Sequence, residues 1–401
     1  MSLAVGLVVV AAVLTGAVGQ QVAGLSADDP SAAGSPAPAE PSPDPAASPS
    51  PEPRVEPDVE HESNVLLVWG HGGTDSSFSD AVRTLPGVLA VSTVRVDRRD
   101  LASARTADGR VAAELPGNWV VPLDTAAIDP DDHAAVLGSA AAGLAGLAPG
   151  QALLGETSAA LRGLGVGAVV SLADGSTREI VGIVDDRVGG YAELIVHPDD
   201  PAGVDIERYL LVRHDGDAAS VADAIRAVAT EELRIRPMAD ARYPRHGDGV
   251  LPQVVIKTHF GEFAMLDVAG RRIQVGATWR DEYLETRTLP HVGLTVCHRV
   301  VMDAFDAVLD DLAARGLLGG INPSQYQGCW LGRVIGASRT LSHHSWGLAV
   351  DVNVNPADVF TAELSEAVIQ TFERHGFVWG GDFLRPDEPH FEYVGDLLGD
   401  R

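Results

Sequence analysis

Two short segments near the C-terminus carry side chains that could bind a metal ion. His344 and Asp351 stand seven positions apart, and His390 follows further along the chain. Imidazole nitrogens and a carboxylate are typical ligands of catalytic zinc, whose site keeps three protein ligands and a fourth, open position. Zinc lowers the pKa of a water in that position to about 7, which yields a nucleophile at neutral pH. The residues therefore predict a hydrolytic zinc centre made of His344, Asp351 and His390.

The elements that must position these ligands can be predicted from the surrounding pattern. Gly347 interrupts any helix, and residues 348–354 alternate between apolar and other positions as a strand does. We expect His344 on a loop that enters this strand, Asp351 on the strand, and His390 in a second short strand. Helical spacing of apolar residues predicts helices over 296–316 and 361–375. Two neighbouring strands would then bring the three ligands together.

The spacing of these residues resembles that of the zinc D-Ala-D-Ala carboxypeptidase and dipeptidase family, which includes vancomycin-resistance peptidases and phage L-alanyl-D-glutamate endolysins. The positions in register are Ser342, His344, Gly347, Ala349, Asp351, the stretch Trp379-Gly380-Gly381-Asp382, and Asp387 three residues before His390. The resemblance covers about residues 251–394. It implies that His344, Asp351 and His390 bind zinc and that Asp387 is the general base.

The resemblance leaves two assignments open. Many family members carry Glu at the base position, so Glu388, beside Asp387, is an alternative base. The family also uses an upstream arginine, and the segment Gly328-Cys329-Trp330-Leu331-Gly332-Arg333 resembles the stretch that carries it in the actinobacterial branch. We assign that role to Arg333, with Arg339 as the rival. A planar guanidinium can hold a substrate carboxylate, or the developing oxyanion, through two hydrogen bonds.

The middle of the chain is expected to be rich in β-strands. Strands are predicted over 64–69, 88–96, 166–172, 179–184, 208–213 and 233–236, with a hairpin turn at Asp174-Gly175 and helices at 79–85 and from Ser220. Residues 64–240 resemble the extracytoplasmic core domain of MacB-like ABC-transporter permeases. The motifs are Leu85-Pro86-Gly87-Val88, Leu153-Leu154-Gly155-Glu156, Gly165-Val166-Gly167 and Ile183-Val184-Asp185-Asp186. The resemblance implies a fold and a contact with an envelope protein partner, since no catalytic constellation is visible here.

The N-terminal part of the chain predicts export. Residues 1–25 are apolar and uncharged, as in a signal peptide or a membrane anchor, although the usual basic start is missing. Residues 26–63 consist mainly of Pro, Ala, Ser and acidic residues, a composition that predicts a disordered stalk. In an exported protein, the two cysteines, Cys297 and Cys329, are expected to form a disulfide. The formal net charge of −27 argues against a nucleic-acid partner.

Together these observations predict an α+β protein in four parts. They are a signal peptide or membrane anchor (1–25), a linker (26–63), a separate, β-rich MacB-like α+β domain (64–243), and a zinc-peptidase domain (250–401) with a small antiparallel sheet flanked by helices. We expect an exported Zn²⁺ peptidase, membrane-anchored or secreted to the cell wall, that cleaves an amide bond of peptidoglycan stem peptides. A D-Ala-D-Ala carboxypeptidase is the first expectation. An L-alanyl-D-glutamate-type endopeptidase and a non-catalytic zinc-bearing binding module are the alternatives.

Overall fold

The computed structural model describes residues 62–71, 73–200, 207–245, 247, 251–268, 270–335 and 339–398. The predicted signal peptide or anchor (1–25) lies outside these residues, as does the predicted linker (26–63) except for Glu62 and Ser63. The described residues belong to one compact unit, residues 56–401. Among them, no helix is both long and apolar enough to cross a membrane. The predicted boundary between 243 and 250 stays a prediction.

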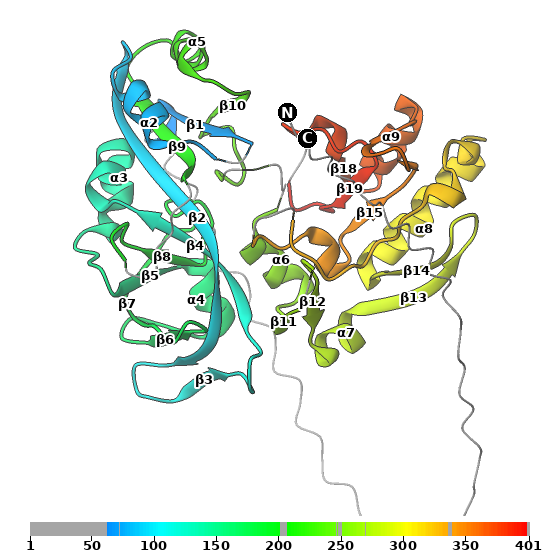
Figure 1. Ribbon diagram of the computed structural model, residues 1–401, viewed down its shortest axis with the longest axis horizontal. Coiled ribbons are helices and arrows are strands. Elements are labelled where there is room, and N and C mark those ends of the chain that lie inside the picture. Colours follow the sequence, from blue (N-terminus) through cyan, green and yellow to red (C-terminus); the bar gives the residue numbers. More distant parts are fainter. Residues whose placement is uncertain are drawn as a thin grey trace, which may run out of the picture. The chain divides into compact units, whose positions relative to one another are not determined.

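Residues 65–237, here named the barrel region, form a ten-stranded sheet (Figure 1). Its strands are β1 (Val65–Gly70), β2 (Val88–Arg105), β3 (Val111–Glu114), β4 (Val121–Ile128), β5 (Gln151–Gly155), β6 (Val169–Leu172), β7 (Thr177–Val184), β8 (Leu194–Val196), β9 (Glu207–His214) and β10 (Leu233–Pro237). The order β2-β4-β8-β5-β7-β6 returns to β2, because Leu101–Arg105 of β2 also pairs with β6, and closes a barrel. The first half of β2 pairs instead with β9, which continues through β1 to β10.

Four α-helices cover this sheet. They are α2 (Ser76–Arg83), α3 (Pro130–Leu137), α4 (Glu156–Arg162) and α5 (Ala218–Val228), and the 3₁₀ turn η1 (Gly138–Leu144) follows α3. Aspartates begin three of the helices, because a carboxylate at the N-cap accepts hydrogen bonds from free backbone amides. Asp75 accepts from the Phe78 amide, Asp129 from those of Asp131 and Asp132, and Asp217 from that of Ser220.

Residues 251–398, here named the C-terminal region, combine helices with small antiparallel sheets. The helices are α6 (Gln253–Phe260), α7 (Ala277–Tyr283), α8 (Arg299–Ala314) and α9 (Glu366–Arg374). The strands are β11 (Met265–Asp267), β12 (Ile273–Val275), β13 (Leu284–Leu289), β14 (Gly293–His298), β15 (Ala349–Asp351), β16 (Val354–Asn355), β17 (Asp358–Ala362), β18 (Phe377–Trp379) and β19 (His390–Tyr393). The predicted α+β class and the small antiparallel sheets are confirmed.

Both helices predicted here begin later than the sequence pattern indicates. Residues 296–298 belong to β14, and α8 starts at Arg299, where the His298 side chain accepts a hydrogen bond from the Val300 amide. Residues 358–362 form β17, and α9 starts only at Glu366. β14 leads directly into α8, so the apolar positions of the strand continue those of the helix. Residues 363–365 separate β17 from α9, and Ser365 is the N-cap of that helix.

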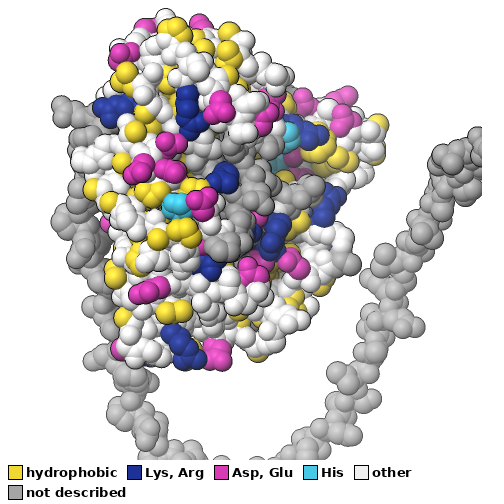
Figure 2. All heavy atoms as spheres, turned by 60° about the vertical axis from the view of Figure 1, so that its left-hand side comes forward, with side chains coloured by type: hydrophobic (Ala, Val, Ile, Leu, Met, Phe, Trp, Pro, Cys, Tyr) yellow, Lys and Arg dark blue, Asp and Glu magenta, His cyan; other side chains and the backbone are white. Residues whose placement is uncertain are grey.

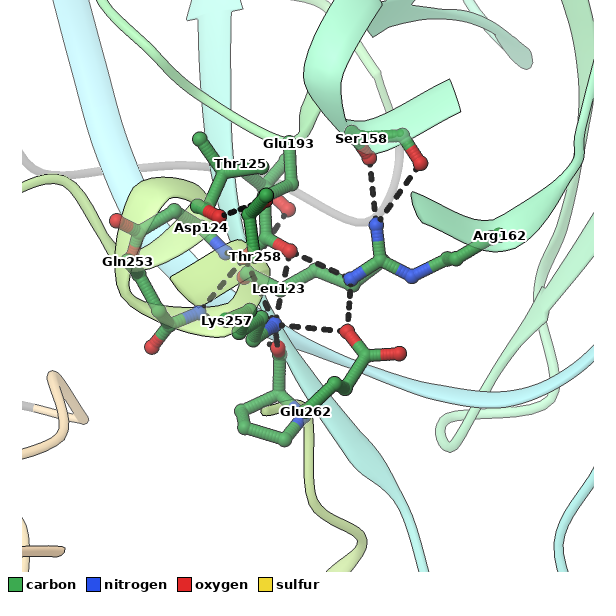
Figure 3. A network of polar contacts seen from close by, with 12 residues as sticks. Leu123, Asp124, Thr125, Ser158, Arg162, Glu193, Gln253, Lys257, Thr258 and Glu262 are labelled. Atoms are coloured by element: carbon green, nitrogen blue, oxygen red, sulfur yellow. Dashed lines mark hydrogen bonds and ion pairs between the residues drawn. The ribbon is translucent and has the colours of Figure 1, made fainter. Parts of the chain in front are cut away.

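A buried ionic network joins α6 to the barrel region (Figure 3). Lys257, the only lysine of the sequence, is 1% exposed, and its Nζ lies 2.8 Å from Oε1 of the fully buried Glu193. Arg162 of α4 pairs with Glu193 and also with Glu262, which follows α6. The two cations hold the pKa of Glu193 down to about 2 although burial alone would raise it. Each buried charge therefore has partners, as burial in a low-dielectric interior requires.

Candidate metal centre

Pairing of two strands brings the predicted ligands together. β15 and β19 are antiparallel neighbours in the three-stranded sheet β15-β19-β18, and Asp351 stands directly opposite His390. His344 lies on the 3₁₀ turn η4 (His343–Trp346) just before β15. Gly347 ends this turn at φ 67°, and a Cβ there would lie 2.6 Å from the His298 amide nitrogen. Only glycine fits this tight turn, which returns the chain into β15.

The His344 ring is oriented so that one nitrogen is left for a ligand. Nδ1 lies 2.6 Å from the carbonyl oxygen of Cys329, so this nitrogen carries the proton and donates. Nε2 is buried without a hydrogen-bond partner and lies 3.2 Å from Oδ2 of Asp351. A buried ring nitrogen that cannot donate and has no donor facing it fits a metal ion, which would bind its lone pair.

Asp351 and His390 complete the cluster. Oδ1 of Asp351 lies 2.9 Å from Nδ1 of His390, and one ligand atom from each of the three residues falls within 4.8 Å of the others. Burial lowers the pKa of His390, but its hydrogen bonds to Asp351 and Glu392 outweigh burial and raise it to about 10. Burial would raise the pKa of Asp351, yet the two histidines hold it far below its usual range. This cluster could hold a metal ion.

Glu392 supports the cluster, and the sequence analysis missed it. It is 6% exposed, and its carboxylate accepts from Nε2 of His390 at 3.2 Å and pairs with Nδ1 of His343 at 2.9 Å. The contact leaves Nδ1 of His390 to face the cluster. His343 and His390 hold the pKa of Glu392 well below its usual range although burial would raise it. Strand alternation was the available signal, because residues two apart on β19 face the same side.

Asp387 and Glu388, the two candidate bases, point to different partners. Glu388 accepts a hydrogen bond from the Ala362 amide at 2.8 Å, so its carboxylate is held against β17. Asp387 is half-buried, and burial raises its pKa. Its charge also interacts with His390, Asp351 and Arg333. Of the two candidate bases, Asp387 is thus the one whose charge interacts with the cluster.

The loop that carries Asp387 is built by the Trp379-Gly380-Gly381-Asp382 stretch. The Asp387 amide donates to the Gly380 carbonyl at 2.9 Å, and the His390 amide donates to the Asp387 carbonyl at 3.1 Å. A Cβ at Gly380 would lie 2.6 Å from the Asp387 carbonyl oxygen. Nε1 of Trp379 donates to the Glu388 carbonyl at 2.7 Å. The glycine and the tryptophan therefore fix this loop against the strand that holds His390.

The two candidate arginines, Arg333 and Arg339, also differ in their contacts. The backbone of Arg333 is bonded to the turn that carries His344: its amide donates to Oγ of Ser345, and its carbonyl accepts from the Ser342 amide. Its guanidinium lies near enough to lower the pKa of Asp387. Arg339 instead binds Oδ2 of Asp100 in β2 at 2.7 Å. Of the two arginines, Arg333 is therefore the one whose charge acts on Asp387.

Cys297 of β14 and Cys329 form a disulfide with a Cα–Cα distance of 5.3 Å. The Cys329 carbonyl is the group that orients His344, so the disulfide ties this acceptor to the core of the C-terminal region. Two further residues beside the cluster are buried. Ser342 is 3% exposed and Trp346 is 1% exposed, and Nε1 of Trp346 donates to the Gly261 carbonyl.

Comparison with known families agrees with this geometry. Residues 336–393 match a family described as D-alanyl-D-alanine carboxypeptidase. The resemblance to this family is confirmed for the C-terminal segment. The matched segment contains the three candidate ligands and Asp387, and it begins after Arg333 and both cysteines. The assignment of Arg333 therefore depends on the motif and on its contacts.

Further comparisons add little. No match is found among curated proteins. The periplasmic region of MacB from Actinobacillus actinomycetemcomitans is similar at 9% identity and a TM-score of 0.30, over 46% of this chain and 93% of that one. The extracellular domain of the noncanonical ABC-type transporter YknZ from Gram-positive bacteria is similar at 12% identity and a TM-score of 0.27, over 43% and 100%. Both are extracytoplasmic domains of transporters, the class of protein that residues 64–240 resemble. Their TM-scores are too low to support any argument about this chain.

Proposed function

We propose that this protein is an exported zinc metallopeptidase that hydrolyses an amide bond of peptidoglycan stem peptides. The bond that we propose first is the terminal D-Ala-D-Ala bond. The observation that carries the proposal is the buried Nε2 of His344, which lacks a hydrogen-bond partner and stands beside Asp351 and His390. Two imidazoles and one carboxylate are a donor set that suits zinc. The segment match to a peptidase family supports the same reaction class.

Each side chain of the site would have a separate role in the proposed hydrolysis. Zinc, when bound by His344, Asp351 and His390, supplies a Lewis acid that lowers the pKa of water to near 7. Asp387 takes a proton from the attacking water and returns it to the leaving amine, which suits a carboxylate whose pKa burial has raised. The Arg333 guanidinium stabilises the negative charge that develops on the carbonyl oxygen of the scissile bond. Glu392 holds the proton on Nε2 of His390, so that Nδ1, which here lies against Asp351, would be the nitrogen that binds the metal.

An exported location is supported by two features. Cys297 and Cys329 form a disulfide, and disulfides persist mainly in oxidising compartments. Peptidoglycan, the proposed substrate, lies outside the cytoplasm. The apolar segment 1–25 and the Pro-rich segment 26–63 would serve as export signal or anchor and as a stalk that reaches the wall.

Release of an amine from defined stem peptides tests the proposal. The purified protein, loaded with one equivalent of Zn²⁺, is incubated with a pentapeptide that ends in D-Ala-D-Ala and with intact sacculi, and the products are identified by mass spectrometry. We expect free D-Ala, lost on treatment with a chelator and restored by zinc. A new N-terminus within the stem would identify an endopeptidase instead. Zinc binding without any cleavage would overturn the enzymatic proposal and favour a binding module.

A further inference from the structure

The two loops that carry Asp387 and Arg333 both continue into contacts with the barrel region. Leu384 follows the Gly380 turn and stands three positions before Asp387. It is 9% exposed and packs in a hydrophobic cluster whose other buried members all come from the barrel region or from Met238 just after it. That cluster contains Trp69 of β1 and Tyr209 of β9, so Leu384 packs the loop of Asp387 against the barrel region.

Two polar contacts with the barrel region lie on either side of Leu384 in the sequence. Nη2 of Arg234 in β10 donates to the Asp382 carbonyl at 2.8 Å, and Nη1 of Arg385 lies 3.4 Å from Nε2 of His71 after β1. These pairs are exposed and contribute little by themselves. They flank Leu384 on both sides, however, and thereby set the direction in which the loop runs back to Asp387.

The segment that follows Arg333 is held by a second contact with the barrel region. Val334 pairs with Leu341, and the Ile335 amide donates to the Thr340 carbonyl, so residues 333–335 and 339–342 run antiparallel. Residues 339–342, here named the returning arm, begin with Arg339. Its guanidinium binds Asp100 at 2.7 Å, and its carbonyl accepts from Nη1 of Arg98 at 3.2 Å.

Arg98 is well placed to hold this arm. It is 3% exposed, and its guanidinium contacts Asp100 beside it in β2, Asp267 of β11 at 2.6 Å and the Arg339 carbonyl. A buried arginine with this many fixed partners is rigid, because its fork of donors is pre-organised. Arg98 and Asp100 of β2 thus contact the C-terminal region at Asp267 and at Arg339 of the returning arm.

We propose that the barrel region positions the catalytic loops: Leu384 positions Asp387, and Arg339, held by Arg98 and Asp100, positions Arg333. These are positioning residues, since they touch neither substrate nor metal. The inference rests on the proposed hydrolysis. It assigns the barrel region a part in the peptidase reaction besides any contact with a partner. A misplacement of about 1 Å in a catalytic group can cost about 100-fold in rate, so loss of either contact should lower kcat.

Kinetics of paired variants test the proposal on the full zinc-loaded protein. We expect Leu384→Ala to lower kcat about 10–100-fold with KM changed less than about twofold, because the loop moves but substrate binding stays. Leu384→Met, which keeps the volume, should restore most of kcat. Arg339→Ala should lower kcat about 5–10-fold, and Arg339→Lys should recover part of it by keeping a charge opposite Asp100.

Two matched controls separate positioning from stability. Leu144→Ala removes the same atoms from the same cluster but from η1 of the barrel region. Arg226→Ala removes an exposed ion pair with Asp223 on α5. Both should keep the kcat of the starting protein. A fall in kcat with Leu144→Ala equal to that with Leu384→Ala, or a normal kcat in Leu384→Ala, would overturn the proposal.

Hydrogen exchange gives a readout that does not depend on activity. Leu384→Ala should speed exchange of the Asp387 amide, which is bonded to the Gly380 carbonyl, about 10-fold or more, and Arg339→Ala should do so for the Ser342 amide, bonded to the Arg333 carbonyl. The control variants should leave both amides protected. Unchanged exchange in both test variants would refute positioning even if the protein hydrolyses no peptide. Faster exchange in a protein that binds zinc but cleaves nothing would leave positioning standing and refute only the proposed hydrolysis.

Discussion

At the scale of single residues, backbone and carboxylate partners decide which ring nitrogens face the cluster. The Cys329 carbonyl accepts a hydrogen bond from Nδ1 of His344, and Glu392 accepts one from Nε2 of His390. Each histidine therefore offers its other nitrogen to the same space beside Asp351. Such outer partners tune the affinity of metal sites, because they fix the tautomer and the ring direction.

The first prediction concerns metal content. His344→Ala and His390→Ala should each abolish stoichiometric zinc, since two ligands cannot hold a catalytic ion tightly. Glu392→Gln should keep a site whose affinity is about 10–100-fold weaker, the usual effect of losing an outer carboxylate. Zinc per chain is measured by elemental analysis and by competition with a chelator. His375→Ala, on the half-exposed end of α9, is the control. Full zinc in both ligand variants would disprove the assignment.

The second prediction separates the two neighbouring carboxylates. Asp387→Ala should keep zinc and lose about 10²–10⁴-fold in kcat, the usual contribution of a general base. Glu388→Ala should change kcat far less, because its carboxylate is engaged with the Ala362 amide away from the cluster. Steady-state kinetics on the zinc-loaded variants measures both. The opposite order of effects would move the role of base to Glu388.

The third prediction concerns Arg333. A group that acts only on the charge developing in the transition state lowers kcat when removed, whereas loss of uniform substrate binding raises KM alone. Arg333→Ala should therefore lower kcat about 10²–10³-fold, the scale of one lost oxyanion donor. Arg333→Lys should recover little, because a point charge does not reproduce the fork. A raised KM at normal kcat would instead indicate that Arg333 binds a substrate carboxylate.

At the scale of elements, much of what holds the site could be predicted from sequence. Alternation after Gly347 predicts β15, and the antiparallel pairing of β15 with β19 matches the expectation that two neighbouring strands bring Asp351 and His390 together. β1, β7 and β9 lie within two residues of their predicted bounds. Local patterns are sufficient for such elements, because each one buries a face whose period can be read directly.

The long strand β2 shows where sequence patterns fail. The sequence pattern predicts a strand over 88–96, yet β2 continues through Asp97, Arg98, Arg99 and Asp100 to Arg105. The charges are tolerated because they pair with Asp267 and Arg339, far away in sequence. Closure of the barrel by β6 depends on a distant partner in the same way. No local pattern identifies such partners.

Among the helices, α3 gives a prediction about pH. His133 is fully buried and neutral: the Ser92 hydroxyl lies 2.7 Å from Nδ1, and Nε2 donates to the Val188 carbonyl at 2.8 Å. Burial lowers the pKa of His133 to about 4 from an ordinary value of 6.5. Between these values the unfolded chain binds a proton that the folded protein does not, so the free energy of unfolding rises with pH. His133 alone should therefore destabilise the protein by about 3 kcal/mol as pH falls from 6.5 to 4.

Chemical denaturation at a series of pH values tests this. His133→Gln should be less stable than the starting protein at pH 7, because it disturbs the buried contacts, but its stability should fall less steeply between pH 6.5 and 4. His197→Gln, at a partly exposed position beside Asp199, should keep the original slope. Parallel pH profiles for His133→Gln and the starting protein would rule out this role for His133.

At the scale of the whole molecule, ion pairs link the two regions of a strongly acidic protein. The formal net charge is −27, yet acidic and basic side chains are interspersed over the face shown in Figure 2. Several arginines form pairs between the barrel region and the C-terminal region, namely Arg98 with Asp267, Arg162 with Glu262 and Arg339 with Asp100. Partners drawn from both regions make the regions depend on each other for charge compensation, which favours one cooperative unit.

The last prediction concerns the centre of that unit. Lys257 binds Glu193 and the Pro122 carbonyl, and Gln253 donates to the same carboxylate at 2.7 Å (Figure 3). Lys257→Met should destabilise the protein by about 3–5 kcal/mol, because removal of one partner leaves a buried carboxylate with less compensation. The double variant Lys257→Met/Glu193→Gln should be less destabilised than the sum of its single variants, since neither uncompensated charge remains.

Urea denaturation at pH 7 measures these differences, with Arg226→Met, at an exposed pair on α5, as the control that should change little. The buried ion pair also makes the stability depend on pH. The pKa of Glu193 is lowered to about 2, so the stability that it contributes is present above its ordinary pKa and is lost as pH falls toward 2. Lys257→Met should weaken this acid sensitivity. A strictly additive double variant would show that Lys257 and Glu193 are not energetically coupled, and that other contacts hold α6 to the barrel region.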